Sequence, residues 1–292
     1  MIFDSHCHAW RAWPYDAAVP DADHRGSIES LLYEMDRHGV ERAMVVCARI
    51  GDDVGPAWSN DDNNSYVDAA VRRFPDRLSM VADVDCSWRP EYHTAGAAVR
   101  LQEAVDRFDL VGFTHYVRLP EDGWFDSDEG HAFFDVAVAN DLLASIAAAP
   151  AWQPAVRRLA ERCPTLPILL HHQGELRLNN PGFATDLEAV LAGAAYPNVH
   201  IKASGFHYLT APSWDYPYER ARTDVLTPLL DAFGPNRLVW GSDFPAARWH
   251  LTYTQSLEAF RSFAPLAGHP GLDRVLGGNL TDLIRTRRPL AD

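Results

Sequence analysis

Short apolar runs of β-forming residues alternate along the whole chain with longer segments of helical periodicity, and this feature constrains the fold most. Such alternation is typical of parallel β/α units, in which each helix returns the chain to the same end of a sheet. The runs that predict strands are 2–7, 43–50, 78–85, 110–117, 142–147, 167–172, 199–204 and 238–243. The predicted helices are 27–38, 65–74, 97–108, 131–140, 153–163, 183–194, 218–233 and 251–263.

Eight such units in 292 residues favour a closed (β/α)8 TIM barrel of the α/β class, with residues 1–292 forming a single domain. The alternative is an open doubly wound sheet, but no G-x-G-x-x-G motif of the dinucleotide-binding form follows the first run. Two long loops, 10–25 and 119–128, are predicted between the units. In a barrel the active site lies at the carboxyl ends of the strands, so reactive residues should gather there.

The charge of the chain excludes several partners. It carries 26 basic and 40 acidic residues, a net charge of -14, and therefore repels phosphate backbones and anionic lipids. No apolar stretch reaches the roughly 18 residues that a membrane span needs, and no leader pattern is visible, so we expect a cytoplasmic protein without nucleic-acid or membrane partners. The 4 widely spaced cysteines indicate reduced, buried thiols. The oligomeric state stays open, a homo-oligomer included.

His6 and His8 form an H-x-H pair on the first predicted strand. A period of two places both imidazoles on one face, and imidazole nitrogens are ligands for Zn²⁺, Fe²⁺ or Mn²⁺. Asp243 ends the run RLVWGSDFP, where its carboxylate would face the histidines across the barrel and bind a metal or act as a general base. The plainer alternatives are that the two histidines are ordinary polar residues at a barrel mouth and that Asp243 caps the N-terminus of a helix.

The sixth run ends in two adjacent histidines, His171 and His172, within PILLHHQG. In a regular strand their side chains point to opposite faces, so only one of them can serve the site. The other is expected to be hydrogen-bonded and structural. The spacing alone does not choose between them.

Cationic and polar residues lie at or just beyond the ends of several other predicted strands: Arg49, His115, Arg118, Lys202 and Ser204. At a barrel mouth they suit an anionic small molecule, because arginine binds a carboxylate through two parallel hydrogen bonds. Each of them alone is also compatible with a surface ion pair. Lys202 is the single lysine of the chain, so any chemistry that needs a lysine amine must use it.

Loop tryptophans offer an aromatic wall for a pocket, although packing beneath the loops is the expected role of most of them. They are Trp10, Trp13, Trp58, Trp88, Trp124, Trp214 and Trp249.

Taken in order, these motifs resemble the amidohydrolase superfamily, and specifically its amidohydrolase-related branch of lactonases and decarboxylases, which includes sugar lactonases. The motifs are H-x-H on strand one, the histidine before x-G on strand six, GSDFP on strand eight and the closing GGNLTDLI. The resemblance implies that Asp243 activates water and that His172, rather than His171, binds the substrate or polarises its carbonyl. It also implies that His6 and His8 hold a metal or a substrate oxygen.

Two departures from the superfamily pattern bear on the metal. The fourth run, GFTHYVRL, lacks the lysine that binuclear members carbamylate, so the resemblance excludes a binuclear carbamate centre. The fifth, LLASIAAAP, has Ala147 and Ala148 where mononuclear members usually supply a histidine. We therefore expect either a single divalent ion held by His6, His8 and Asp243, for which Zn²⁺ is the first choice, or a metal-free mechanism.

The sequence thus predicts a hydrolase that opens a small, carboxylate-bearing lactone or related cyclic ester with water activated by Asp243. Two alternatives remain. One is a metal-dependent decarboxylase or hydratase on the same barrel, and the other is a barrel that binds a small molecule without chemistry.

Overall fold

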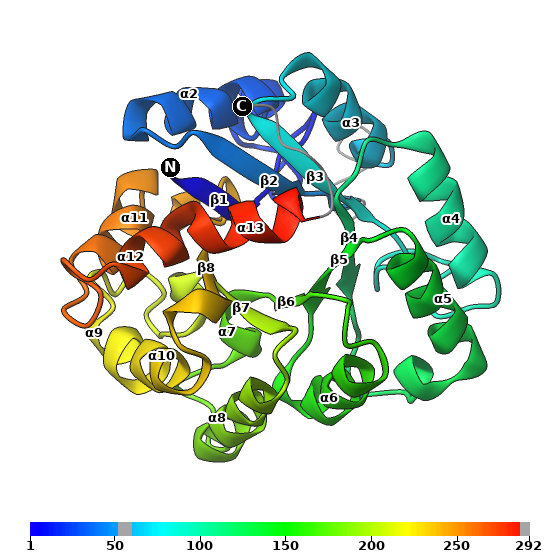
Figure 1. Cartoon of the computed structure of the whole chain (residues 1–292). Helices are drawn as coiled ribbons and strands as arrows, with labels where there is room; N and C mark the ends of the chain where they lie inside the picture. Colours follow the sequence, from blue (N-terminus) through cyan, green and yellow to red (C-terminus); the bar gives the residue numbers. More distant parts are fainter. Residues whose placement is uncertain (52–59, 287–292) are drawn as a thin grey trace.

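Eight parallel strands form a barrel in the computed structural model, which describes residues 1–51 and 60–286 (Figure 1). Each strand pairs with the next one along the chain, from β1 to β8, and the predicted (β/α)8 fold is confirmed. The strands are β1 (Phe3–Cys7), β2 (Arg42–Val46), β3 (Leu78–Asp83), β4 (Gly112–Tyr116), β5 (Leu143–Ala147), β6 (Ile168–Leu170), β7 (Val199–Ala203) and β8 (Leu238–Trp240).

The helices surround the barrel (Figure 1). They are α1 (Ala22–Arg25), α2 (Ile28–His38), α3 (Asn63–Arg73), α4 (Ala97–Arg107), α5 (Asp128–Ala139), α6 (Gln153–Arg162), α7 (His172–Glu175), α8 (Phe183–Leu191), α9 (Glu219–Ala221), α10 (Thr227–Phe233), α11 (Tyr253–Arg261), α12 (Gly271–Asp273) and α13 (Asn279–Arg285). Ser27 begins α2 as expected, because its hydroxyl accepts a hydrogen bond from the Ser30 amide at 3.2 Å. The predicted loop 10–25 contains α1, and the predicted helix 218–233 is divided by the π-helical turn Arg222–Leu226.

The amino end of the barrel is closed by apolar side chains. Alternate strand residues fill this end in one buried cluster with Leu280 and Ile284 of α13, which crosses it in Figure 1. The strand members are Phe3, Met44, Val46, Val81, Leu143, Leu169 and Val239. The interior is therefore blocked at one end, and polar side chains collect at the other.

The seam between the first and last strands lies at the carboxyl end. The His8 amide donates to the Phe244 carbonyl at 2.6 Å, and the Asp243 amide donates to the His6 carbonyl at 2.7 Å. Closing the barrel therefore brings the H-x-H pair directly against the segment that carries Asp243.

Two further expectations concern the chain as a whole. In the described part of the chain, no helix combines the length and apolar character that crossing a bilayer requires. Cys7, Cys47, Cys86 and Cys163 are buried free thiols, as predicted.

Candidate active site

An extra residue in β1 turns the H-x-H pair into the barrel. Asp4 pairs with Ala43 and Cys7 with Val45, so β1 has one residue more than β2 between these two points. Such a bulge reverses the inward and outward alternation beyond it. Without it His6 would share the outward face of Asp4; with it, the His6 ring lies inside, 5.0 Å between centroids from that of His8.

Asp4 joins this bulge to the segment after β8. Its Oδ1 atom accepts hydrogen bonds from the His6 amide at 3.1 Å and the Ser242 amide at 2.9 Å. Its Oδ2 atom accepts from the Ser242 hydroxyl at 2.5 Å and the Tyr253 hydroxyl at 2.9 Å. The buried Asp4 carboxylate therefore holds the residues next to Asp243 in a fixed relation to His6.

Asp243 follows β8 in a left-handed conformation, φ 55°, with its carboxylate almost wholly buried. Its Oδ1 atom lies 3.6 Å from His6 Nε2 and 3.8 Å from His8 Nε2. Its Oδ2 atom lies 3.6 Å from Nε2 of His207. The sequence reasoning missed His207; the signal that could have found it is a histidine close behind the end of the seventh predicted strand.

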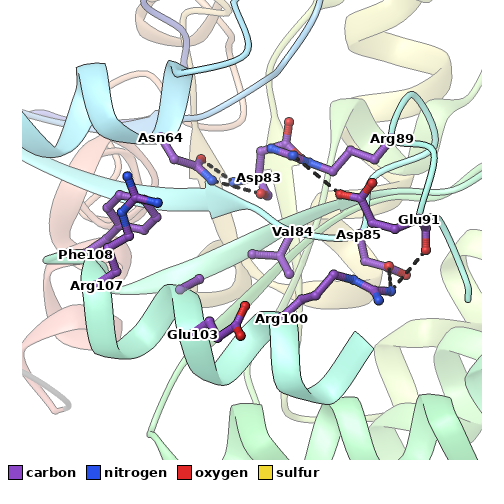
Figure 2. A pocket seen from close by; sticks show the side chains of 11 residues that line it. Asn64, Asp83, Val84, Asp85, Arg89, Glu91, Arg100, Glu103, Arg107 and Phe108 are labelled. Atoms are coloured by element: carbon purple, nitrogen blue, oxygen red, sulfur yellow. Dashed lines mark hydrogen bonds and ion pairs between the residues drawn. The ribbon is translucent and has the colours of Figure 1, made fainter. Parts of the chain in front are cut away.

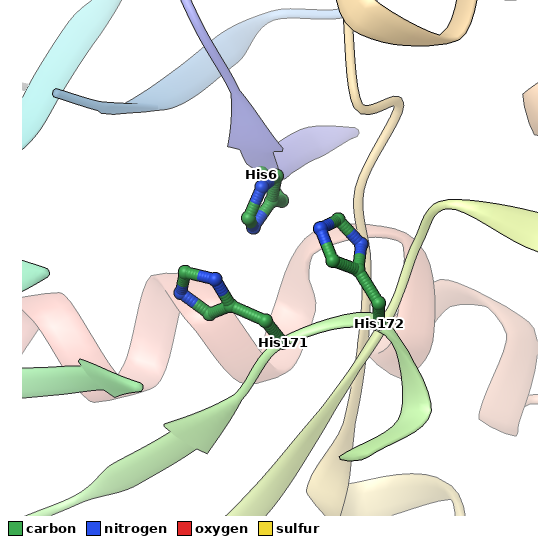
Figure 3. Close-up of side chains that lie close together, drawn as sticks. All are labelled: His6, His171 and His172. Atoms are coloured by element: carbon green, nitrogen blue, oxygen red, sulfur yellow. The ribbon is translucent and has the colours of Figure 1, made fainter. Parts of the chain in front are cut away.

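Both histidines of the sixth run point into the barrel, and the expectation that only one does so is wrong. The ring centroids of His171 and His172 each lie 4.5 Å from that of His6 (Figure 3). The physical reason is that β6 ends at Leu170, before the pair, so the strand alternation no longer applies.

The segment after β6, labelled α7 in Figure 1, is a left-handed turn. His172, Gln173, Gly174 and Glu175 all have positive φ, between 45° and 71°. Each non-glycine residue in this conformation costs about 1–2 kcal/mol. Side chains on Gly174 and Gly205 would meet Val190 Cγ2 at 2.8 Å and His172 Nδ1 at 2.5 Å, so glycine is required at both positions. Strain of this kind is typical of functional sites.

Lys202 lies inside the barrel rather than at its rim. It is fully buried on β7, and its Nζ donates to the Ser145 hydroxyl at 2.6 Å and lies 3.4 Å from His6 Nδ1. The same hydroxyl lies 2.6 Å from His171 Nε2. Ala147, where a ligand would be expected on β5, is buried and carries no ligand atom. Lys202 therefore belongs to an internal polar network beneath the histidines.

Burial sets the protonation states of these groups. It lowers the pKa of His8 to about 4 and that of His207 to about 3, and it lowers those of His6, His171 and His172 well below the usual range. The imidazoles are therefore neutral at pH 7, as metal ligation or proton acceptance requires.

The two charged groups of the centre shift as well. Burial, with the charge of Asp4, raises the pKa of Asp243 well above its usual range. Burial lowers the pKa of Lys202 to about 7. Both shifts reflect the low polarity of the barrel interior, which disfavours an isolated charge of either sign.

The donor set fits a divalent ion. His6, His8 and Asp243 offer ligand atoms within 4.8 Å of one another, and His6, His171 and His172 form a second such group. The buried His6 Nε2 atom has no hydrogen-bond partner among the described residues, and the Tyr208 hydroxyl lies near the Asp243 carboxylate as a donor. Neutral imidazoles and a carboxylate are ligands that zinc takes, and a cation would compensate the buried negative charge.

A cavity of about 280 Å³ opens onto this centre. Its wall is mainly aromatic, with His8 and His172 at the polar side and Glu175 and Arg177 beside them. The remaining lining residues are Tyr15, Ala48, Ile50, Trp88, Tyr116 and Tyr208. Of the predicted candidates, Ser204 supports this wall from behind, because its hydroxyl lies 3.1 Å from His172 Nδ1.

Like Lys202 and Ser204, the other three predicted substrate-binding residues do not line the cavity. Arg49 forms an ion pair with Asp61. Arg118 donates to the Ser87 carbonyl and lies over the ring of Tyr92. His115 is fully buried on the outer face of β4, because strand alternation turns Tyr116 inward and His115 outward.

His115 belongs to an aromatic cluster outside the barrel. Its Nε2 atom lies 3.1 Å from Nε2 of His93, and its ring is stacked near that of Trp124. Burial lowers the pKa of His115 to about 3, so it is a neutral packing residue here.

The loop tryptophans mostly pack, as expected. Trp10, Trp13 and Trp124 are buried, Trp214 and Trp249 are exposed, and Trp88 is the described member that lines the cavity. Trp58 lies outside the described residues.

A second cavity, of about 170 Å³, lies beside β3 and α4 (Figure 2). Four of its charged residues form ion pairs: Arg89 Nε lies 2.6 Å from Asp83 Oδ1, and Arg100 pairs with Asp85. These pairs join the loop after β3 to the barrel and leave the reactive groups concentrated in the first cavity.

Comparisons with known proteins identify the family of the chain. A family model described as amidohydrolase matches residues 3–282. The L-fucono-1,5-lactonase of Burkholderia ambifaria is 28% identical over 313 residues, covering 99% of this chain and 97% of that protein.

Solved structures share the fold. An amidohydrolase from Burkholderia multivorans with bound zinc has a TM-score of 0.74 at 21% identity, covering 97% of this chain and 99% of that one. A probable 2-pyrone-4,6-dicarboxylic acid hydrolase from Acinetobacter baumannii with bound citric acid has a TM-score of 0.71 at 18% identity, covering 97% and 98%. Because the family model spans nearly all of the chain, the protein belongs to the amidohydrolase family of hydrolases.

Proposed function

We propose that the protein hydrolyses a small lactone with water activated by Asp243. The observation that carries the proposal is the buried Asp243 carboxylate, which lies within 3.8 Å of three neutral imidazoles and beside the Tyr208 hydroxyl of the cavity wall. A carboxylate in this state can accept a proton from water and return it to the leaving oxygen. The similarity to a fucono-lactonase supports the same reaction class.

Asp243 and the residues around it have separate roles in the reaction. Asp243 holds a water and takes its proton as the water attacks the ring carbonyl, and the proton then passes to the alkoxide that leaves when the ester bond breaks. His172 lines the cavity, with Ser204 fixing its ring, and donates a hydrogen bond to the carbonyl oxygen as negative charge develops. Tyr208 and Trp88 enclose the ring and exclude bulk water.

His6, His8 and Asp243 would hold a divalent ion, with Zn²⁺ the first choice. When bound, such an ion supplies a Lewis acid that polarises the carbonyl and acidifies water. The zinc-bound neighbour supports this assignment. A metal-free enzyme, in which the histidines alone orient water, is the alternative that metal analysis decides.

The first prediction concerns Asp243→Asn, which keeps the shape of the side chain and removes the proton acceptor. Hydrolysis of a panel of lactones, followed by acid release, should fall by about 100-fold or more, since general-base catalysis contributes that much. Far-ultraviolet circular dichroism and the unfolding midpoint serve as controls for the fold. Full activity in the variant would remove Asp243 from the mechanism.

The same assays separate the alternatives. Release of CO2 in place of a ring-opened acid would identify a decarboxylase, and binding without turnover would identify a non-catalytic barrel. Stoichiometric zinc that a chelator removes together with activity would exclude the metal-free version.

A further inference from the structure

Glu175 is a charged residue of the cavity wall that the sequence reasoning did not consider. It ends the left-handed turn after β6, at φ 59°, three residues beyond His172. Its side chain is partly buried and faces the 280 Å³ cavity. Among the described residues, none forms a hydrogen bond or an ion pair with its carboxylate. The carboxylate faces the cavity, where Arg177 is the charged group that acts on it electrostatically, so its oxygens can accept hydrogen bonds from a ligand.

The neighbours of Glu175 suit a hydroxylated ligand. Arg177, two residues further on, lines the same cavity and lies over the ring of Tyr208, 5.4 Å from its centroid. A carboxylate accepts hydrogen bonds, a guanidinium donates them, and a phenol does both. Adjacent hydroxyl groups on a sugar ring donate and accept in the same way, and the aromatic wall covers the apolar face of such a ring.

The charges around the cavity disfavour a carboxylated ring. A substrate carboxylate would meet the Glu175 carboxylate in the wall. The cations predicted to bind it are engaged elsewhere: Arg49 with Asp61, and Lys202 within the barrel network. Within the described residues, Arg177 is the cation that lines the cavity.

We propose that Glu175 is a specificity-determining residue that accepts hydrogen bonds from substrate hydroxyl groups, so that the enzyme selects polyhydroxylated, uncharged lactones over carboxylated ones. This proposal rests on the proposed lactonase function. In place of the expected anionic substrate, it gives an uncharged substrate and assigns the negative charge to Glu175 of the enzyme.

Glu175→Gln tests the proposal, because the amide keeps the size of the side chain but loses the charge and half of its acceptor capacity. Two six-membered lactones serve as substrates, an aldonolactone and a lactone with a ring carboxylate. For the aldonolactone, kcat/KM should fall by about 10-fold or more, mainly through KM, because unpaired hydroxyl groups weaken binding. For the carboxylated ring it should stay constant or rise. Glu175→Asp should restore part of the preference.

Glu188→Gln is the matched control, since Glu188 lies exposed on α8 and away from the cavity lining. It should leave both substrates unchanged. Equal losses on both substrates in Glu175→Gln would show a merely structural role and overturn the proposal. If the wild-type enzyme opens neither lactone, the proposed function fails. Calorimetric binding of the two unreacted rings to wild type and variant then decides the role of Glu175 separately.

Discussion

At the scale of single residues, identical side chains take different roles here because burial and direction differ. His172 and His115 are both buried and both neutral, yet one lines the cavity and the other packs among aromatic rings outside the barrel. Because both are histidines near predicted strand ends, the sequence predicted both as site candidates. Only the direction of the Cα–Cβ bond separated them, and that direction depends on where a strand begins and ends.

Lys202 gives a prediction at this scale. The Nζ atom of Lys202 contacts Ser145 and His6 and does not line the cavity. Lys202→Met should therefore lower kcat by about 10-fold or more while KM stays within about 3-fold. This pattern is expected of a group that stabilises the transition state and does not contribute to ground-state binding. Steady-state kinetics over a range of lactone concentrations measures both constants. Ser145→Ala, which breaks the same bridge and keeps the amine, should change kcat in the same direction. A raised KM with normal kcat would instead make Lys202 a direct substrate contact.

At the scale of elements, two irregular segments position the site. The bulge in β1 turns His6 inward, and the left-handed turn after β6 presents His172 and Glu175 to the cavity. Both depart from ideal strand and helix geometry. Strand alternation counted from Asp4 would turn His6 outward, and it does not give the direction of His172 and Glu175, because periodicity rules assume regular elements.

Gly174→Ala tests the turn. Its φ of 71° and the 2.8 Å approach to Val190 should together destabilise the fold by about 2–4 kcal/mol, the sum of a left-handed penalty and an overpacked methyl group. Urea unfolding measures the loss. Gly182→Ala is the matched control, because a methyl group there meets nothing closer than 3.8 Å and φ is −88°, and its effect should stay within about 0.5 kcal/mol. Equal effects of the two substitutions would show that the turn is not strained.

At the scale of the whole molecule, the fold holds many neutral histidines inside and around the barrel. Those whose pKa is lowered by burial are His6, His8, His93, His115, His171, His172, His207 and His250. Below pH 6.5 they protonate in the unfolded chain but not in the folded one, so folding stability is complete above that pH and is lost as the pH falls. Asp4, whose pKa burial raises to about 6, acts in the opposite direction, as does Asp243.

The free energy of unfolding should therefore decrease between pH 6.5 and pH 5, because the histidines outnumber the two aspartates. One histidine that stays neutral in the fold contributes up to about 2 kcal/mol over that interval. Urea unfolding at both pH values, in wild type and in His115→Gln, measures the difference. The variant should lose less stability on acidification by up to that amount, and an identical pH dependence would show that His115 is not held neutral.

The order of eight β/α units, the barrel and the candidates His6, His8 and Asp243 followed from the sequence, because hydrophobic period and strand-end position are local properties. The choice of His172 over His171 came only from the resemblance of the motifs to a known family. The tertiary structure decided which of these side chains meet. It adds Lys202 and His171 to the centre and leaves out His115, Arg49 and Arg118. The reason is physical. Three features decide the site: the added residue in β1, the early end of β6 and the burial of each charged group. All three depend on contacts between segments far apart in the chain, so no local sequence pattern predicts them.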